Sequence, residues 1–402
     1  MYVSGFRRLF AFEGYVIERV NLNTDMAQVN LRRDRRFRLS CPQCGTRMAR
    51  NRSRKQVAYD LPLGMAGWVT LVYEAVQGRC PCCEQCHTVR PSCICKNARA
   101  TWRMMRYVSA LCRFMAPSRV SEFVPVSTST ARRWDKRVLE TELPEPDLDD
   151  LEVLLVDEKS VGKHHQYMTV VWDGRSGELL YMAEGKKKRS LRGFFDKLED
   201  RQKESIRAVG MDRGGAYKQV VEEEVPEARI VYDKFHLIKN YHQVIDEVRR
   251  QEWRRADEEH KDLVKGQRYN LFRNEENLTD QQEQTLQRLL DENERLNTVY
   301  VLKDALRKLW EYTYRGCAET YLHRWAQWAR EGGLEPVKKF ARGLLEAKEQ
   351  VLNYCDHRIT LGPLEGFNNL ISRTLHRACG YQDMDYFFLK LRQASLKPRP
   401  QK

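Results

Sequence analysis

The sequence predicts a multidomain α/β protein, because three kinds of pattern follow one another along its 402 residues. A cysteine-rich segment comes first, then apolar runs that alternate with amphipathic segments, and then long charged stretches with helical spacing. This length exceeds what one hydrophobic core usually supports, and 42% hydrophobic with 31% charged residues is ordinary for a globular protein. We therefore expect several domains, each with its own core.

The first domain, predicted over residues 1–98, is a zinc ribbon. Eight of the twelve cysteines fall within residues 41–95, and we find neither an export signal nor an apolar stretch of the roughly 18 residues that span a bilayer. Since disulfides form in oxidising compartments, we interpret this cluster as a metal site in a cytoplasmic protein. In "CPQCG", the two-residue spacing lets the thiolates of Cys41 and Cys44 reach one Zn²⁺ ion from a tight turn.

The second half of the zinc site is predicted in "RCPCCEQCHTVRPSC", where two pairings have the required spacing. We prefer Cys80 with Cys83, and Cys83 with Cys86 is the alternative. Between the two halves, "LPLGMAGWVTLVYEAVQG" is typical of two strands joined near Gly64 to Gly67, which is the layout of a zinc ribbon. The remaining donors either bind a second zinc or are surplus thiols and a histidine: Cys82, Cys86, His87, Cys93 and Cys95.

Residues 99–145 are predicted to form a helix-turn-helix. "ATWRMMRYVSALCRFM" has apolar residues at helical spacing, and Ser127 is a suitable cap for a second helix in "TSTARRWDKRVLE". Such a second helix places its exposed side chains in a DNA major groove, whereas a small helical bundle would leave a solvated basic face. The proline- and acid-rich "TELPEPDLDD" marks a domain boundary near residue 145. The side chains expected to contact DNA are Thr130, Arg132, Arg133 and Lys136.

Residues 146–240 are predicted to form the first part of a ribonuclease H-like core. The order is a strand in "LEVLLVD", two strands around "DGRSG", a helix in "SLRGFFDKLED", a strand in "IRAVGMD", a helix in "YKQVVEEEV" and a strand in "RIVYD". Such a core brings the ends of its first and fourth strands side by side. Asp157 and Asp212 stand at these two strand ends, and Gly214 and Gly215 let the chain turn closely beside Asp212.

An α-helical insertion, residues 241–355, is predicted to interrupt this core. The core resumes over residues 356–394, where a helix begins near Pro363 and Glu365 lies in its first turn. Asn368 and Arg373 follow on this helix, in a stripe suited to a metal-bound phosphate. Residues 395–402 are interpreted as a basic tail. Four tryptophans of the insertion are expected to pack between its helices: Trp253, Trp310, Trp325 and Trp328.

Three carboxylates are predicted to form a metal site: Asp157, Asp212 and Glu365. A carboxylate is costly to desolvate unless it is paired or metal-bound, so acids at the ends of buried strands favour a bound divalent cation. Mg²⁺, or Mn²⁺ in its place, suits an all-oxygen site that keeps positions open for water or phosphate. Glu158 follows Asp157 in its strand and is expected on the opposite face of the sheet. Asp233 and His236 in "VYDKFH" are interpreted as supporting residues.

The charge of the chain indicates a polyanionic partner. Its formal net charge is +14 and its pI is near 9.2, properties that concern association rather than fold. Double-stranded DNA is the expected partner, and a protein that is merely basic is the plainer alternative. We expect phosphate contacts to dominate the affinity, which should then fall steeply as salt rises.

In their order and spacing, these motifs resemble those of the ISL-three family of bacterial insertion-sequence transposases, over nearly the whole chain. The matching segments are "CPQCG" with its distant cysteine partner, the helix-turn-helix, "VDEKSVGKHHQYMTVVWD", "GMDRGGAY", "VYDKFHLIKN" and "LEGFNNLISRTLHRACGYQDMDYFFLKLR". The crowded second cysteine cluster departs from the family pattern, which leaves the second pair of zinc ligands open.

The resemblance implies a DDE transposase in which Asp157, Asp212 and Glu365 hold two Mg²⁺ ions. Water first attacks at an end of the element, and the liberated 3′ hydroxyl then attacks target DNA. The resemblance also implies that at least a homodimer binds the terminal inverted repeats, in a protein associated with the nucleoid when on DNA. Two other classes would use the same parts: a structure-selective ribonuclease H-like nuclease without strand transfer, and a zinc and helix-turn-helix regulator without a working site.

Overall fold

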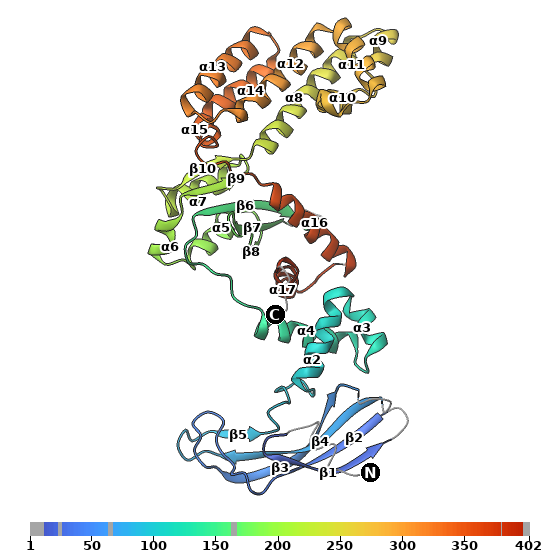
Figure 1. Ribbon diagram of the computed structural model, residues 1–402, viewed down its shortest axis with the longest axis vertical. Helices are drawn as coiled ribbons and strands as arrows, with labels where there is room; N and C mark the ends of the chain where they lie inside the picture. The colour runs from blue at the N-terminus through green and yellow to red at the C-terminus, as the bar shows by residue number, and fades with distance from the viewer. Residues whose placement is uncertain (1–11, 23–25, 63–66, 162–166, 379, 397–402) are drawn as a thin grey trace. The chain divides into compact units, whose positions relative to one another are not determined.

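The structure is a computed structural model that describes residues 12–22, 26–62, 67–161, 167–378 and 380–396 (Figure 1). The chain divides into two compact units, of which unit 1 consists of residues 1–144 with 373–402 and unit 2 of residues 145–372. The predicted mixed α/β class is confirmed, because each unit contains a five-stranded sheet together with helices. Among the described helices, none combines the length and the apolar composition that a membrane span requires.

The sheet of unit 1 is built around β4 (Trp68–Arg79). β4 pairs antiparallel with β3 (Ala49–Asp60) along one edge, and its other edge pairs parallel with β2 (Met26–Arg33) and antiparallel with β5 (Cys86–Val89). β1 (Tyr15–Leu22) completes the sheet beside β2. Of the predicted strand pair, the second strand is present as β4, whereas its antiparallel partner β3 ends at Asp60, before "LPL", and residues 63–66 at the predicted joint lie outside the described residues.

The helices of unit 1 are α2 (Trp102–Phe114), α3 (Pro117–Phe123), α4 (Thr128–Glu142) and α17 (Met384–Ser395). Ser127 caps α4 as expected, because its hydroxyl accepts a hydrogen bond from the backbone N–H of Thr130 at 3.3 Å. Trp134 of α4 packs in the core with Met104 of α2. α17 packs on α4 and α2, so the range 356–394 expected to complete the core is divided between the two units.

A buried ion pair joins α17 to α4 inside unit 1. Asp135 is fully buried and accepts hydrogen bonds at 2.6 Å from both the Ser109 and the Tyr386 hydroxyls. Lys390 is 3% exposed and donates to Asp135 Oδ2 at 3.0 Å. Since buried charges are costly unless paired, this contact explains why α17 belongs with α4 although about 250 positions separate the partners in sequence.

The sheet of unit 2 has the strand order β10-β9-β6-β7-β8. β6 pairs antiparallel with β7, which pairs antiparallel with β8, whereas β6, β9 and β10 run parallel. The order of elements expected from the sequence is present, because α5 and α6 connect β8 to β9 and α7 connects β9 to β10. The bounds are β6 (Val153–Ser160), β7 (Tyr167–Asp173), β8 (Leu179–Glu184), α5 (Lys188–Phe195), α6 (Asp200–Ser205), β9 (Ala208–Met211), α7 (Gly215–Glu224) and β10 (Arg229–Tyr232).

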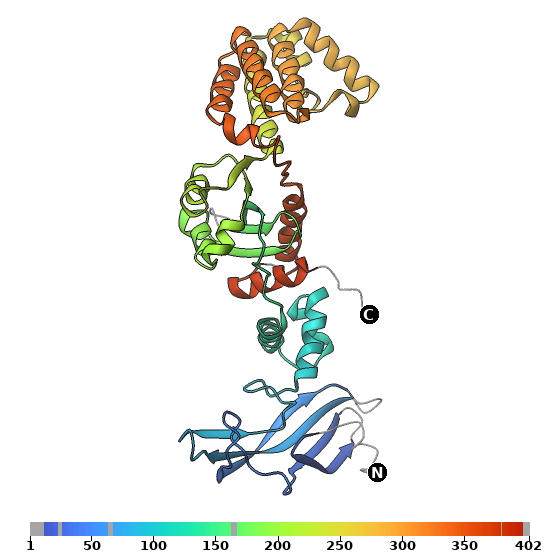
Figure 2. The same cartoon turned by 60° about the vertical axis from the view of Figure 1, so that its left-hand side comes forward.

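The two faces of this sheet are covered by different helices. Val171 of β7 packs in the core with Phe194 of α5 and Val220 of α7. Trp172, the next residue, points to the opposite face, where its ring meets Phe367 of α16 (Gly362–Arg377) edge-on, with centroids 4.4 Å apart. Figure 2 shows the dark red α16 on one side of the green sheet and the green helices on the other.

The helical part of unit 2 begins directly after β10, with α8 (Lys234–Arg255). The expected boundary at residue 241 therefore falls inside a helix, because Asp233, the first residue after β10, already caps α8 and no loop intervenes. Trp310 and Trp325 are buried as predicted, whereas Trp253 and Trp328 are exposed. The other helices are α9 (Glu258–Val264), α10 (Arg268–Phe272), η2 (Glu275–Asn277), α11 (Asp280–Glu292), α12 (Glu294–Lys308), η3 (Leu309–Glu311), α13 (Arg315–Glu331), α14 (Glu335–Glu346) and α15 (Lys348–Leu352).

Candidate functional site

The parallel pairing of β6 and β9 brings two of the predicted carboxylates together. Val156 of β6 is in register with Met211 of β9, and Asp157 and Asp212 are the next residues on the two strands. Val156 contributes to the core on the α5 side, so alternation along the strand directs Asp157 to the face covered by α16. Glu158 then points to the opposite face, as the sequence predicts.

Asp157 lies in contact with α16 through a hydrogen bond. Asn368 Nδ2 donates to Asp157 Oδ2 at 3.0 Å, and the backbone N–H of Glu158 donates to Oδ1 at 2.7 Å. Burial raises the pKa of Asp157, the hydrogen bond from Asn368 opposes this shift, and the nearby charge of Asp212 adds to it. The folded protein therefore holds a carboxylate whose negative charge is only partly compensated.

Glu365 lies in α16, three residues before Asn368. Residues three apart occupy neighbouring positions on one face of a helix, so the backbone of Glu365 belongs to the helix face that carries Asn368. The side chain of Glu365 lies outside the described part of the structure. The hydrogen bond from Asn368 to Asp157 thus holds this face of α16 against the end of β6.

Asp212 and Asp233 both lie beside His236. His236 Nδ1 lies 2.6 Å from Asp212 Oδ1 and 3.0 Å from Asp233 Oδ2, but only the contact with Asp233 has hydrogen-bond geometry. Asp212 Oδ1 is consequently a buried oxygen without a hydrogen-bond partner among the described residues. Contact with Asp212 first, and with Asp233 second, raises the pKa of His236 to about 10.

Asp233 has a positioning role that its place in the sequence does not reveal. The carboxylate is 3% exposed, its Oδ2 accepts from the backbone N–H of His236 at 3.1 Å, and its Oδ1 accepts from the backbone N–H of Leu361 at 3.3 Å. Asp233 therefore caps α8 and holds the segment that leads into α16. Gly210 of β9 permits this crossing, because a Cβ there would lie 2.6 Å from Ile359.

These contacts identify the oxygens that are available to a divalent cation. Asp212, Asp233 and His236 place ligand atoms within 4.8 Å of one another, and both oxygens of Asp157 and of Asp233 accept hydrogen bonds within the protein. Oδ1 of Asp212 accepts no hydrogen bond among the described residues, and carboxylate oxygens are the donors that a hard cation such as Mg²⁺ prefers.

A second cluster consists of thiols in unit 1. Cys44 Sγ lies 3.4 Å from Cys80 Sγ, and Cys41 Sγ lies 3.7 Å from Cys83 Sγ. Tetrahedral zinc with Zn–S bonds of about 2.3 Å separates its sulfurs by about 3.8 Å, so these distances fit one ion. Cys86 is a strand residue of β5 and is not part of the cluster. The four sulfurs that lie within 4.8 Å of one another belong to Cys41, Cys44, Cys80 and Cys83.

The thiols of this cluster differ in acidity. Hydrogen bonding to Thr46 lowers the pKa of Cys44 to about 6, whereas hydrogen bonding to Cys80 raises the pKa of Cys83 to about 12. His87 Nε2 lies 3.5 Å from Cys83 Sγ. Within the described ranges, three or more metal-binding side chains gather only here and around Asp212, so the remaining cysteines form no second cluster there.

The side chains predicted to contact DNA do not all remain accessible. Arg132 and Arg133 are exposed on α4, and Arg373 is exposed on α16. Thr130 Oγ1 accepts a hydrogen bond from Ser127 at 3.0 Å. Lys136 differs from the expectation, because its Nζ pairs with Asp383 at the start of α17, at 2.7 Å. A contact across 247 positions leaves no signal in a local sequence pattern.

Comparison with known proteins gives consistent similarities. Residues 154–391 match the model of the ISL-three family, which is described as a transposase family. The chain is 33% identical over 396 residues to the transposase for insertion sequence element IS1001 of Bordetella parapertussis, with 96% of each chain covered. It is 26% identical over 381 residues to the transposase for insertion sequence element IS1557 of Mycobacterium tuberculosis, covering 85% of this chain and 82% of that protein. The family match includes the positions of Asp157, Asp212 and Glu365.

Proposed function

The chain belongs to the ISL-three family of transposases, and from this membership we propose that it cuts the DNA ends of an insertion sequence and joins them to target DNA. The proposed catalytic carboxylates are Asp157, Asp212 and Glu365. The observation that carries this assignment is the hydrogen bond from Asn368 to Asp157, because it holds the helix of Glu365 against two adjacent strand ends. We propose that these residues form one site.

The strand order of unit 2 supports a ribonuclease H-like core as the scaffold of this site. Three antiparallel strands followed by two parallel strands place the ends of β6 and β9 side by side. The helices from α8 to α15 occupy the sequence between Asp212 and Glu365, which is where the proposed insertion lies. In the same proposal, the sheet of unit 1 with its thiol cluster is a zinc ribbon, and α3 with α4 is a helix-turn-helix.

Asp157, Asp212 and Glu365 would hold Mg²⁺ or Mn²⁺, which when bound would relieve negative charge at the scissile phosphate and favour a deprotonated nucleophile. Two other residues, Asn368 and His236, orient the carboxylates of this site. Asn368 fixes the orientation of Asp157 through Oδ2. His236 Nδ1 lies 2.6 Å from Asp212 Oδ1 and 3.0 Å from Asp233 Oδ2, and we assign it to orienting Asp212.

The partner in this proposal is double-stranded DNA, both as the terminal inverted repeats of the element and as the target. The net charge of +14 supports a polyanionic partner. Joining two ends to one target requires both ends in one assembly, so we propose at least a homodimer on DNA. Cys41, Cys44, Cys80 and Cys83 would hold a structural Zn²⁺.

The test of the catalytic assignment is a cleavage assay on duplex DNA that contains an end of the element, with Mg²⁺ or Mn²⁺. We expect Asp157→Asn, Asp212→Asn and Glu365→Gln each to lower the cleavage rate by at least about 100-fold. Glu158→Gln is the matched control, because this carboxylate is adjacent to Asp157 on the opposite face of β6 and should leave the rate nearly unchanged. Wild-type cleavage rates in all three variants would refute the assignment.

A second measurement separates a transposase from a nuclease. End DNA that is already cut, with a free 3′ hydroxyl, is mixed with the protein and a supercoiled plasmid. Joined products are expected for the wild type and should be lost in Asp157→Asn. Cleavage of intact ends without any joined product would favour a structure-selective nuclease on the same core.

A further inference from the structure

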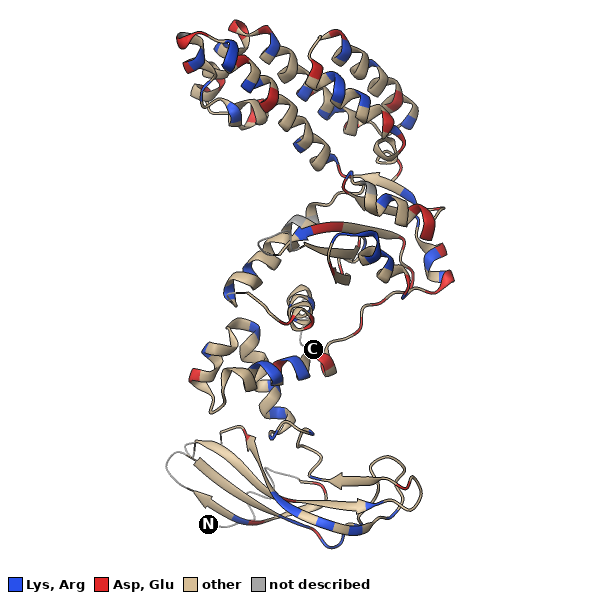
Figure 3. Cartoon of the chain, turned by 180° about the vertical axis from the view of Figure 1, so that it is seen from behind, with Lys and Arg blue, Asp and Glu red and all other residues tan. Residues whose placement is uncertain are grey.

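The positive charge of the chain is concentrated in a short segment of unit 1. Residues 32–55 contain ten arginines and lysines and one carboxylate, Asp34, which gives this segment a charge of +9 out of the chain's +14. Figure 3 shows basic residues along β3, the strand that contains the second half of the segment. β3 is the last strand of its sheet, and its first seven residues are exposed. Such a concentration is the electrostatic footprint of a polyanion-binding surface.

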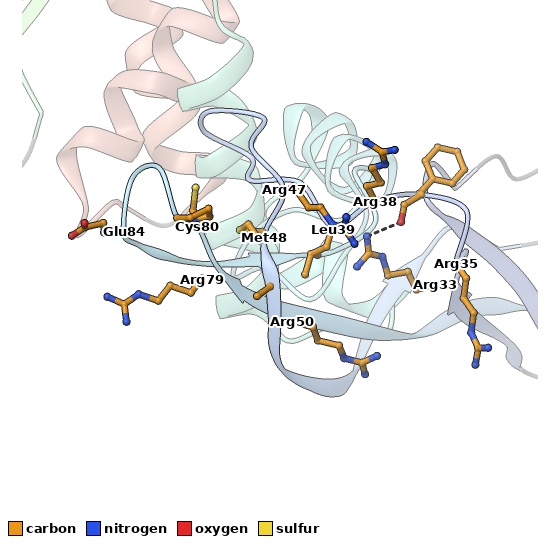
Figure 4. A pocket seen from close by; sticks show the side chains of 13 residues that line it. Arg33, Arg35, Arg38, Leu39, Arg47, Met48, Arg50, Arg79, Cys80 and Glu84 are labelled. Atoms are coloured by element: carbon orange, nitrogen blue, oxygen red, sulfur yellow. Dashed lines mark hydrogen bonds between the residues drawn. The ribbon is translucent and has the colours of Figure 1, made fainter.

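Six arginines line one groove of about 990 Å³ (Figure 4), and all but Arg79 of β4 belong to this segment. Five of them are exposed and Arg33 is half-buried. Glu84 is the only carboxylate among the described residues that line the groove. We call this set the arginine arc: Arg33, Arg35, Arg38, Arg47, Arg50 and Arg79.

Most of the arginine arc is not neutralised within the protein. Arg50 forms an ion pair with Glu74 at 2.6 Å, and Arg33 donates to the backbone carbonyl of Phe37 at 3.1 Å. Among the described residues, no carboxylate lies within ion-pair distance of the other four, which are Arg35, Arg38, Arg47 and Arg79. Exposed, uncompensated guanidinium groups are suited to phosphate oxygens, which they bind in a bidentate geometry.

The backbone beneath the arginine arc adjoins the thiol cluster and a small buried core. Arg38 precedes Leu39 and Arg47 precedes Met48. Leu39 and Met48 face each other, since Met48 N donates to the Leu39 carbonyl at 2.7 Å. Arg79 immediately precedes Cys80 of the cluster. Leu39, Met48 and Cys80 form a small buried core below the groove together with Cys41 and Val76. The arginines therefore project from a preformed floor, which limits the entropy lost when they bind.

We propose that the arginine arc binds the phosphate backbone of duplex DNA and that it, rather than α4 alone, provides the electrostatic affinity of unit 1 for DNA. This inference rests on the proposed function for its choice of DNA over other polyanions. Contacts to phosphate carry no sequence information, so the arginine arc would position the protein on any duplex, and base recognition would come from other side chains.

The test is the salt dependence of binding to a mixed-sequence DNA duplex, measured by fluorescence anisotropy with the full chain. The variant replaces Arg35, Arg38, Arg47 and Arg79 by alanine. Each lost phosphate contact lowers the slope of log K against log salt by about 0.9, so the slope should fall by about 3 to 4. Between about 50 and 200 mM salt, the wild type should then lose roughly 100-fold more affinity than the variant.

Two control variants make the outcome decisive. Replacing Arg254, Arg324, Arg330 and Arg342 by alanine removes the same charge from exposed positions on the helices of unit 2, and the slope should stay within about 1 of the wild type. Replacing the four arc residues by lysine keeps the charge and should keep the slope, whereas a folding defect would appear as a lower unfolding temperature of the alanine variant.

The outcomes distinguish this inference from the proposed function. If the wild type binds duplex DNA and the alanine variant of the arginine arc has the same slope, the arginine arc is not the phosphate site, although the transposase proposal stands. If the wild type binds no duplex DNA, both proposals fail. Equal binding of a double-stranded RNA, with the same dependence on the arginine arc, would overturn the assignment to DNA.

Discussion

Replacing Lys390 by methionine should loosen the attachment of α17 to α4. Lys390 Nζ donates to Asp135 Oδ2 at 3.0 Å, to the Cys112 carbonyl at 3.0 Å and to Gln393 Oε1 at 2.7 Å. Without this cation, the fully buried carboxylate of Asp135 retains only hydroxyl donors. Leaving one partner of a buried ion pair uncompensated costs about 3 to 5 kcal/mol.

Hydrogen exchange followed by mass spectrometry measures this loss locally, which suits a chain with two units better than a global unfolding curve. About 3 kcal/mol corresponds to amide exchange in α17 and α4 that is roughly 100-fold faster. Lys136→Met is the matched control, because the neighbouring ion pair with Asp383 is partly exposed and its loss should cost less than about 1 kcal/mol.

A double variant completes the experiment. Asp135→Asn with Lys390→Met removes both charges, so it should destabilise α17 much less than the sum of the two single changes. Unchanged exchange in Lys390→Met, or strict additivity in the double variant, would contradict the reasoning that the contact is a buried ion pair.

Three other perturbations have defined outcomes. Asn368→Ala removes the hydrogen bond to the strand-end carboxylate and should slow DNA cleavage by about 10- to 100-fold, whereas Ser372→Ala on the same helix should not. Cys41→Ser should abolish the zinc content measured by mass spectrometry, while Cys82→Ser, outside the four-sulfur cluster, should retain it. Burial lowers the pKa of Lys303 from 10.5 to about 8. Between these values the unfolded state binds more protons, so stability should rise with pH by up to about 3 kcal/mol. The urea midpoint should show this rise in the wild type, and Lys303→Met should lack it.

The α/β core could be predicted from the sequence because its periodicities are strong. Strands that are buried on both faces appear in the sequence as apolar runs. Helices that cover one face of a sheet, such as α5, have apolar residues three or four positions apart. The order of elements around Asp157 and Asp212 could therefore be predicted. β1, β2 and β5 were not predicted. β3 was misplaced because its first seven residues are exposed on both faces and give no alternation.

Apart from the paired strand ends and the four-sulfur cluster, contacts between distant segments could not be predicted. Oδ1 of Asp233 accepts a hydrogen bond from the backbone N–H of Leu361, which lies 128 positions away. The pairing of Lys136 with Asp383 and of Asp135 with Lys390 has the same cause. Local patterns identify which side chains are polar, whereas the fold decides which of them already have partners.

The position of β3 at the edge of its sheet has a consequence for solubility. An unpaired strand edge is a template on which a strand of another molecule can add, and proteins commonly protect such edges with charge. β3 carries basic side chains along most of its exposed length, so two copies repel each other where their edges would otherwise join. Replacing these residues by neutral ones should therefore promote aggregation of the free protein. Duplex DNA bound along β3 would reverse the local charge through its phosphates and so remove the repulsion between two strand edges.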